Sequence, residues 1–173
     1  MRLYNRRMKV SAQEEYGLRC LLQMTRLDAQ ESLSIAEISR AEELSVPNVA
    51  KLMRILRLGG LVCSVRGQAG GYVLARPAES ITMDQVLRVL GGPLFGSRFC
   101  ELHTGIGKTC AHCGDCSIRP VWLKMQELVG EVLKRTSLKD LLQDEAQMRE
   151  WVANTVDNGR EGHRDALAST TSR

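Results

Sequence analysis

Apolar residues recur every three or four positions over most of the chain, which predicts a mainly helical fold. Helices are expected over residues 11–28, over two segments within 33–58, over 81–91, from 120 to about 134, and over 137–153. Ser11 with Glu14, and Ser34 with Glu37, have the spacing of a capping box, in which each side chain bonds the other residue's backbone amide. Two of these helices therefore have a defined start.

The second helix within 33–58 is expected to begin at Ser45, with Pro47 in its first turn, where proline costs no hydrogen bond. Its buried stripe is expected to comprise Val46, Val49, Leu52 and Leu56. The opposite face carries Asn48, Lys51, Arg54 and Arg57. A short helix, a tight turn and a second helix with a basic outer face are typical of helix-turn-helix DNA binding. Taken alone, such a face is more often an ordinary solvated surface.

After the second of these helices, the spacing of apolar residues changes to the two-residue period of a β-strand. Leu61–Val65 and Tyr72–Ala75 are predicted strands, joined by the glycine-rich segment Arg66–Gly71. A hairpin directly after a candidate recognition helix is the winged-helix order. Glycines allow the hairpin tip to approach a DNA backbone closely, and Arg66 is suited to the negative potential of the minor groove. The hairpin therefore favours the DNA-binding interpretation of the helix before it.

The helix from Pro120 is expected to be the longest. It carries one apolar stripe, comprising Val121, Met125, Leu128 and Val132 and widened by Val129 and Leu133. We expect this stripe to pack on a second protomer, and the alternative is an ordinary core helix. The last helix is expected to be capped by Ser137 and anchored by Leu138. From residue 154 the chain is polar and is predicted to be a disordered tail.

Composition narrows the choice of class. With 173 residues the chain is long enough for one domain and an appended arm, and its 43% hydrophobic content with only 4% aromatics predicts an aliphatic core. A net charge of +4 permits a nucleic-acid partner without demonstrating one. No apolar run approaches the roughly 20 residues that span a bilayer, and the basic start lacks the apolar segment of a secretion signal. We expect a cytoplasmic protein without a membrane partner, with Met8 as an alternative start to Met1.

Four of the six cysteines lie between residues 95 and 119: Cys100, Cys110, Cys113 and Cys116. The last three have the spacing C-x-x-C-x-x-C, which lets the backbone aim successive sulfur atoms at one centre. Thiolates select soft metal centres, chiefly iron–sulfur clusters and zinc. We favour a cluster over structural zinc, and both over two disulfides. The other two cysteines, Cys20 and Cys63, are expected to be small core residues.

Several sequence motifs follow in a fixed order. They are Y-G-L-R-C-L at 16–21, I-A-E-I at 35–38, L-x-x-I-L-R-L-G-G-L-V at 52–62, R-G-x-x-G-G-Y-x-L-A-R at 66–76, then the cysteines, Trp122 and S-L-K-D-L at 137–141. Over about residues 8–143 the chain resembles the family of winged-helix, iron–sulfur transcription regulators typified by IscR and NsrR. The wing motif followed by cysteines is the most specific part of this resemblance.

The resemblance implies a homodimer that binds a double-stranded, palindromic DNA operator. It implies a winged helix-turn-helix over residues 1–80, and the cysteine segment with dimerisation helices over 81–153. Candidate DNA-binding residues, from this resemblance and from the basic face and wing, are Ser45, Asn48, Lys51, Arg54, Arg66, Gly70 and Gly71. Ala50 stands where one branch of the family has an acidic base-reading residue, and Pro47 where it has a serine, so the operator sequence does not carry over.

The cysteine segment departs from the family pattern. Nine residues separate Cys100 from Cys110, Cys113 is an additional cysteine, and Arg119 stands where some members have a histidine ligand. Glu15 stands where others supply a carboxylate from the partner's first helix. We therefore favour four thiolate ligands to a 4Fe–4S rather than a 2Fe–2S cluster, with Glu15 and His103 as weaker candidates. His112 is a minor candidate.

Two other classes of function compete with transcriptional regulation. An iron–sulfur electron carrier also uses C-x-x-C-x-x-C, but such proteins usually add a cysteine followed by proline, whereas Ser117 follows Cys116 here. Catalysis is not expected, because the chain shows neither a nucleophile–base arrangement nor a phosphate-binding loop that leads into a helix. The prediction is thus a non-enzymatic regulator, mainly α with a small β-wing and a long dimerisation helix.

Overall fold

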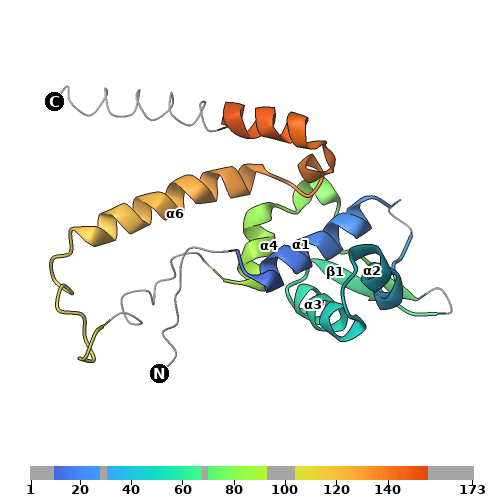
Figure 1. The fold of residues 1–173 in the computed structure, drawn as a ribbon, viewed down its shortest axis with the longest axis horizontal. Helices are drawn as coiled ribbons and strands as arrows, with labels where there is room; N and C mark the ends of the chain where they lie inside the picture. The colour runs from blue at the N-terminus through green and yellow to red at the C-terminus, as the bar shows by residue number, and fades with distance from the viewer. Residues whose placement is uncertain (1–9, 28–30, 68–69, 93–103, 156–173) are drawn as a thin grey trace.

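The computed structural model describes residues 10–27, 31–67, 70–92 and 104–155. The helices are α1 (Ala12–Thr25), α2 (Ile35–Glu42), α3 (Val46–Leu58), α4 (Met83–Leu90) and α6 (Ile118–Arg135), with a further helix over 145–155. The strands are β1 (Val62–Val65) and β2 (Gly71–Leu74), and two 3-10 helices are η1 (Ala78–Ser80) and η2 (Asp140–Leu142). Figure 1 shows α1 to α4 and the strands gathered into one body from which α6 extends. The predicted mainly helical fold with a small β-wing is confirmed.

Side-chain caps fix where the first helices begin. Ser11 Oγ accepts from the Glu14 amide at 3.3 Å, and Glu14 Oε2 accepts from the Ser11 amide at 2.7 Å. Ser34 and Glu37 form the same pair at the start of α2. Both predicted capping boxes are therefore confirmed, and each satisfies amides that the helix itself leaves without an acceptor.

The wing is a two-stranded antiparallel sheet in which Val62 pairs with Leu74 and Val65 with Gly71. The segment before α2 extends this sheet, because the Leu33 amide donates to Tyr72 O at 3.0 Å and the Tyr72 amide donates to Leu33 O at 2.8 Å. The wing is thereby fixed to the start of the helix-turn-helix rather than only to the end of α3.

The core is one continuous aliphatic cluster. It joins α1, α2, α3 and β1 to four residues further along the chain, Ile81, Val86, Leu90 and Leu138. Cys20 lies in it, as predicted, but Cys63 is exposed, so that prediction was wrong. Strand alternation explains the error: Val62 occupies the inward position of β1, and its neighbour faces outward.

The buried stripe of α3 also differs from the prediction at one position. Val49, Leu52 and Leu56 are buried, but Val46 is the first residue of α3, lies one turn before the buried stripe begins, and is 51% exposed. Met53, which the sequence analysis did not include, is fully buried instead.

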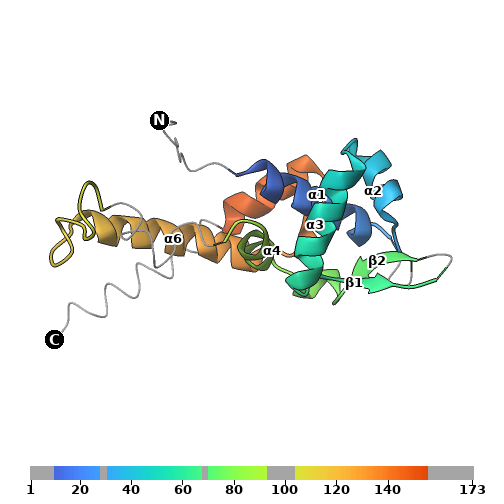
Figure 2. The same cartoon turned by 90° about the horizontal axis from the view of Figure 1, so that it is seen from below.

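Helix α6 begins two residues earlier than predicted, with Pro120 in its first turn rather than at its start. None of its 18 residues is fully buried, although apolar residues recur along it. In both views α6 extends away from the body formed by α1, α2 and α3, and residues 104–117 lie at its far end (Figures 1 and 2). A helix with an apolar stripe and no buried side chain has room for a partner on that stripe.

The single helix predicted over 137–153 was wrong. Ser137 and Asp140 cap the short turn η2, with the Ser137 amide 2.7 Å from Asp140 Oδ2. A second capping pair, Asp144 with Gln147, then starts the helix over 145–155. Leu138 is fully buried, which confirms its predicted role as an anchor. The tail predicted from residue 154 lies almost entirely outside the described residues. None of the helices in the described ranges is long and apolar enough to cross a membrane.

Candidate nucleic-acid interface and metal centre

The outer face of α3 carries the predicted basic residues. Lys51, Arg54 and Arg57 are exposed and Asn48 is partly exposed. Ser45 is the N-cap residue of α3, in an extended conformation, and its side chain makes no capping hydrogen bond. A hydroxyl and several cations therefore point away from the core along one helix, as a surface that binds phosphates and base edges requires.

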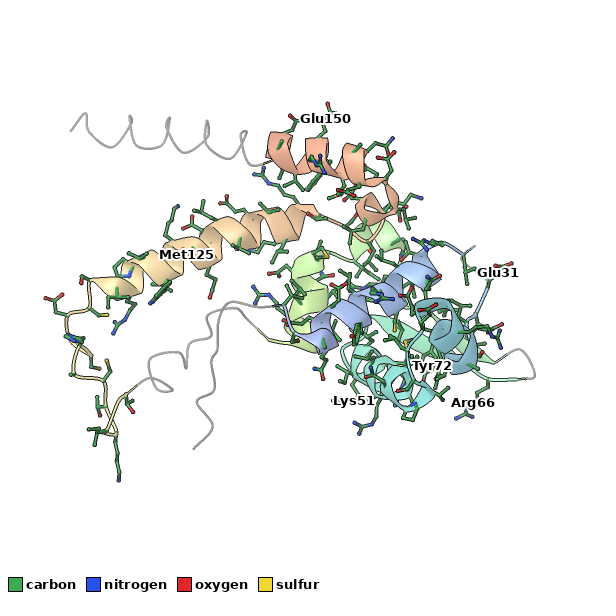
Figure 3. The ribbon with its side chains drawn as sticks, in the orientation of Figure 1. Glu31, Lys51, Arg66, Tyr72, Met125 and Glu150 are labelled. Carbon is green, nitrogen blue, oxygen red and sulfur yellow. The ribbon has the colours of Figure 1, made fainter. Side chains whose placement is uncertain are left out.

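The wing presents Arg66 directly after β1, with its side chain exposed. Figure 3 shows Lys51 and Arg66 on the same side of the body, both pointing outward. The structure thus brings a cation of α3 and a cation of the wing to one face, where a single duplex can meet both.

The two wing glycines among the candidate residues have a structural explanation. A Cβ atom on Gly71 would lie 2.5 Å from Leu33 O, in the bridge that fixes the wing. A Cβ atom on Gly70 would lie 2.8 Å from Gly67 O and 3.0 Å from Val65 O. Both positions require glycine because backbone atoms, which cannot rotate away, occupy the space. Their contact with DNA stays a prediction.

Three of the four candidate cysteine ligands lie in the described part of the chain. Cys113 is exposed, Cys110 and Cys116 are partly exposed, and all three are free thiols. The Cys113 amide donates to Cys110 O at 3.1 Å, which forms a turn, and Arg119 donates to Cys113 O at 3.2 Å, which ties the turn to α6. The segment is therefore continuous with the start of the long helix.

The donor set suits a soft metal centre, because three accessible thiols that are not engaged in disulfides lie within seven residues. Within the described ranges no three histidine, cysteine or acidic side chains are gathered closely enough to hold a metal ion. Cys100 and His103 lie outside those ranges, and His112 is exposed. Glu15 is exposed on α1, which both views show well separated from the cysteine segment of the same chain (Figures 1 and 2).

Helix α4 connects the cysteine segment to the helix-turn-helix, a link that the sequence analysis missed. A Cβ atom on Gly17 would lie 2.6 Å from the Leu90 side chain, and Gln13 of α1 donates to Leu90 O. Val89 packs against Gly59, the residue that ends α3. The other side of α4 faces α6, across a groove lined by Leu87, Arg88, Leu123 and Gly130 among others. The last turn of α4, directly before the cysteine segment, thus contacts both α1 and the end of α3.

Comparison with known proteins extends these observations. Residues 10–144 match the model of the Rrf2 family, described as iron-dependent transcriptional regulators. The HTH-type transcriptional regulator CymR of Bacillus subtilis is 31% identical over 134 residues, which cover 78% of this chain and 89% of that protein. The HTH-type transcriptional regulator IscR of Cereibacter sphaeroides is 32% identical over 143 residues, covering 80% and 89%.

Solved structures agree. CymR of B. subtilis, a global cysteine regulator, superposes with a TM-score of 0.63 at 30% identity, covering 79% of this chain and 98% of that chain. IscR of T. potens superposes with a TM-score of 0.62 at 32% identity, covering 80% and 90%. These relatives are regulators rather than enzymes, and their winged-helix fold binds DNA. The chain therefore belongs to the Rrf2 family of transcriptional regulators, as the resemblance drawn from its motifs predicted.

Proposed function

We propose that this Rrf2-family regulator is a homodimer whose operator binding is controlled by an iron–sulfur cluster in the cysteine segment. The observation that carries the proposal is that the cysteine segment is connected to the DNA-binding body at both ends. Three free thiols directly precede α6, and α4, which precedes the segment, packs against the end of α3. A change of shape in the cysteine segment has a short physical route to the DNA-binding surface. We place this function in the cytoplasm, where the operator is accessible.

The proposed DNA contacts follow from exposure and charge. Lys51, Arg54 and Arg66 supply cations on one face, and Asn48 and Ser45 supply polar groups near the start of α3 (Figure 3). Lysine and arginine that neutralise phosphates make affinity fall steeply with salt, and polar groups at the start of a recognition helix read base edges. Gly70 and Gly71 let the wing keep the shape in which Arg66 is presented.

The proposed ligands are Cys100, Cys110, Cys113 and Cys116, with Glu15 and His103 as weaker candidates. Arg119 is engaged with the backbone of the segment and has no lone pair to offer a metal. A 4Fe–4S cluster bound by these thiolates, favoured over 2Fe–2S, supplies a group that responds to redox state, nitric oxide or cluster supply. The contribution of this chain's residues is to hold the segment in one conformation at the start of α6.

The proposed dimer forms through α6. Val121 and Leu128 are 55% and 53% exposed, and with Ile118 and Met125 they follow the three- and four-residue spacing of a helix–helix seam. Pairing two copies along this seam fixes the distance between the two α3 helices, which must match two half-sites of a palindrome. Because α4 lies between α6 and the end of α3, a change at the cysteine segment alters that match.

A structural zinc site remains the alternative for the same thiols, since four thiolates also suit a tetrahedral ion. It differs in consequence: a zinc-bound regulator would bind DNA equally well before and after exposure to oxygen or nitric oxide. The electron-transfer alternative draws no support from the comparisons, because the relatives named above are regulators.

The experiment that tests the proposal is an anaerobic absorption spectrum of freshly purified protein, with iron, sulfide and zinc assays on the same sample. Absorbance around 400 nm with iron and sulfide, lost in Cys110→Ser and retained in Cys63→Ser, supports the cluster. Cys63 is the matched control because it is exposed, free and outside the segment. Stoichiometric zinc in a colourless protein would replace the cluster by the zinc site. DNA affinity of the loaded and stripped protein then shows which form binds the operator.

A further inference from the structure

The end of α2 holds a buried carboxylate that the proposed function does not use. Glu42 is the last residue of α2 and is only 8% exposed, one of three buried polar residues in the described part of the chain. A buried carboxylate is costly unless both oxygens are hydrogen-bonded. The hydrogen-bond partners of Glu42 should therefore indicate its role.

Two residues of α1 engage Glu42 completely. Arg19 Nε lies 2.6 Å from Oε2, and Gln23 Nε2 lies 2.5 Å from Oε1. A second nitrogen of Arg19 donates to the backbone carbonyl of Glu42 at 3.0 Å, and the guanidinium stacks 5.7 Å from the ring centre of Tyr16. The hydrogen bond with Glu42 raises the pKa of Arg19 above its ordinary value, so the guanidinium stays charged. We call Arg19, Gln23 and Glu42 the Glu42 clamp.

The clamp holds the backbone directly before the turn of the helix-turn-helix. Glu43 follows in the left-handed conformation, with φ of 54°, and Ser45 is already the N-cap of α3. On the other side of the turn the Leu44 amide donates to Ser39 O at 3.1 Å, and Ser39 Oγ donates to Leu44 O. Because only Glu43, Leu44 and Ser45 separate the two helices, the position of Glu42 sets where α3 starts and how it is oriented.

A purely stabilising role does not explain the choice of residues. The Arg19 side chain is 40% exposed and that of Glu42 is 9% exposed, so the pair lies at the edge of the core. Apolar side chains are often as stable as a buried charge in such a place, whereas directed hydrogen bonds select one geometry among several. Arg19 fixes Glu42 through its side chain and its main chain at once, which an apolar contact cannot do. The clamp therefore constrains orientation more than it adds cohesion.

We infer that Glu42 is a positioning residue for DNA recognition: the clamp fixes the orientation of α3 so that Ser45 and Asn48 meet the base edges in register. This inference rests on the proposed DNA interface. The inference predicts different effects on two kinds of DNA contact, those to phosphates and those to bases. Phosphate contacts tolerate a small rotation of α3, while base contacts do not.

The test compares operator and non-specific affinity in Glu42→Gln. The probes are a duplex selected by the wild-type protein from a random library and a scrambled duplex of equal length, both measured by fluorescence anisotropy at fixed salt. Affinity for the selected duplex should fall about tenfold, the scale of one lost base contact, while affinity for the scrambled duplex should change less than about twofold. Glu43→Gln, the same chemical change on the adjacent exposed residue, is the matched control and should leave the ratio of the two affinities unchanged.

Arg19→Lys is a second test of the clamp. Lysine keeps the positive charge but cannot bond the Glu42 side chain and the Glu42 carbonyl at the same time. It should shift the affinity ratio in the same direction, and the double variant should be no worse than Glu42→Gln alone. If circular dichroism shows that Glu42→Gln does not fold, the affinity ratio of Arg19→Lys alone tests the inference. Equal losses on both duplexes, or no loss while Lys51→Ala weakens operator binding, would overturn the clamp. No effect of Lys51→Ala and Arg54→Ala together would instead overturn the DNA interface.

Discussion

The side chain of Val89 on α4 lies directly against Gly59, the residue at which α3 ends. No side chain larger than hydrogen fits at Gly59 without displacing Val89. The contact joins the helix before the cysteine segment to the helix proposed to read DNA.

Removing this contact should uncouple the segment from DNA binding. Val89→Ala is expected to leave iron and sulfide content unchanged but to bring the operator affinities of cluster-loaded and cluster-free protein closer together, by roughly threefold or more in their ratio. Val152→Ala, on the helix over 145–155, is the control for loss of an apolar side chain elsewhere. An unchanged ratio in Val89→Ala would show that the signal takes another route.

Arg66→Ala tests the wing. Loss of this exposed cation should weaken operator binding about tenfold at fixed salt and lower the slope of log affinity against log salt by about one. Arg149→Ala removes the same charge from an exposed site far along the chain and should change neither quantity appreciably. Unchanged operator affinity in Arg66→Ala would remove the wing from the interface.

Cys20 gives the folded protein a defined response to alkaline pH. Burial, followed by the charge of Glu42, raises the pKa of its thiol from 9.0 to about 11. The unfolded chain loses the proton near pH 9, so stability is fully present below that pH and falls as pH rises towards 11, by roughly 2–3 kcal/mol. Urea unfolding of the wild type and of Cys20→Ala between pH 8 and 11 should show a steeper decline in the wild type. Parallel declines would contradict this assignment.

Two glycines in helices should respond in opposite directions to the same substitution. Gly17→Ala places a methyl group 2.6 Å from the buried end of Leu90 and should cost about 1–2 kcal/mol net of helix propensity. At Gly130 of α6, no atom of the described residues beyond the adjoining helix backbone lies within 4 Å of such a methyl group, so Gly130→Ala should stabilise the chain by about 0.5–1 kcal/mol. Chemical denaturation at one protein concentration measures both. A gain in Gly17→Ala would mean that α4 moves away from α1 at little cost.

Glu43 is the single non-glycine residue with positive φ in the described ranges. An L-residue pays about 1–2 kcal/mol for the left-handed conformation, while glycine pays about 0.5–1 kcal/mol in lost chain freedom. Glu43→Gly is therefore expected to raise the free energy of unfolding by about 0.5–1 kcal/mol. Glu43→Ala removes the same carboxylate without that relief and should not stabilise, so equal gains in both variants would point to charge instead.

Local signals in the sequence predicted most of the fold. Ser11 with Glu14 and Ser34 with Glu37 marked helix starts because both partners of each cap lie within one turn. The wing was predictable because strand period and glycine spacing are also local. The split after Leu142 also has a local signal, the Asp144–Gln147 capping pair, but the leucine spacing across it predicts one continuous helix.

What the sequence could not supply were relationships between distant positions. Nothing near Glu42 indicates that Arg19 and Gln23 lie on the helix beside it, and nothing near Val89 indicates Gly59. The exposure of Val46 likewise depends on packing between helices, which the sequence of α3 alone does not show. The cysteine spacing predicted a soft-metal site from the donors alone, but where its parts meet is decided by tertiary structure.

The shared core sets a limit on how such regulators can be recombined. Ile81, Val86, Leu90 and Leu138 complete the hydrophobic cluster of α1 to α3, although they lie beyond the wing in sequence. A chimera joined at residue 80 would leave that cluster open unless the incoming half restored all four side chains in place. The helix-turn-helix and the segment that follows it are thus not interchangeable modules. New pairings of operator and signal must arise by substitution within one chain, because exchange of whole modules would break the body that both halves share.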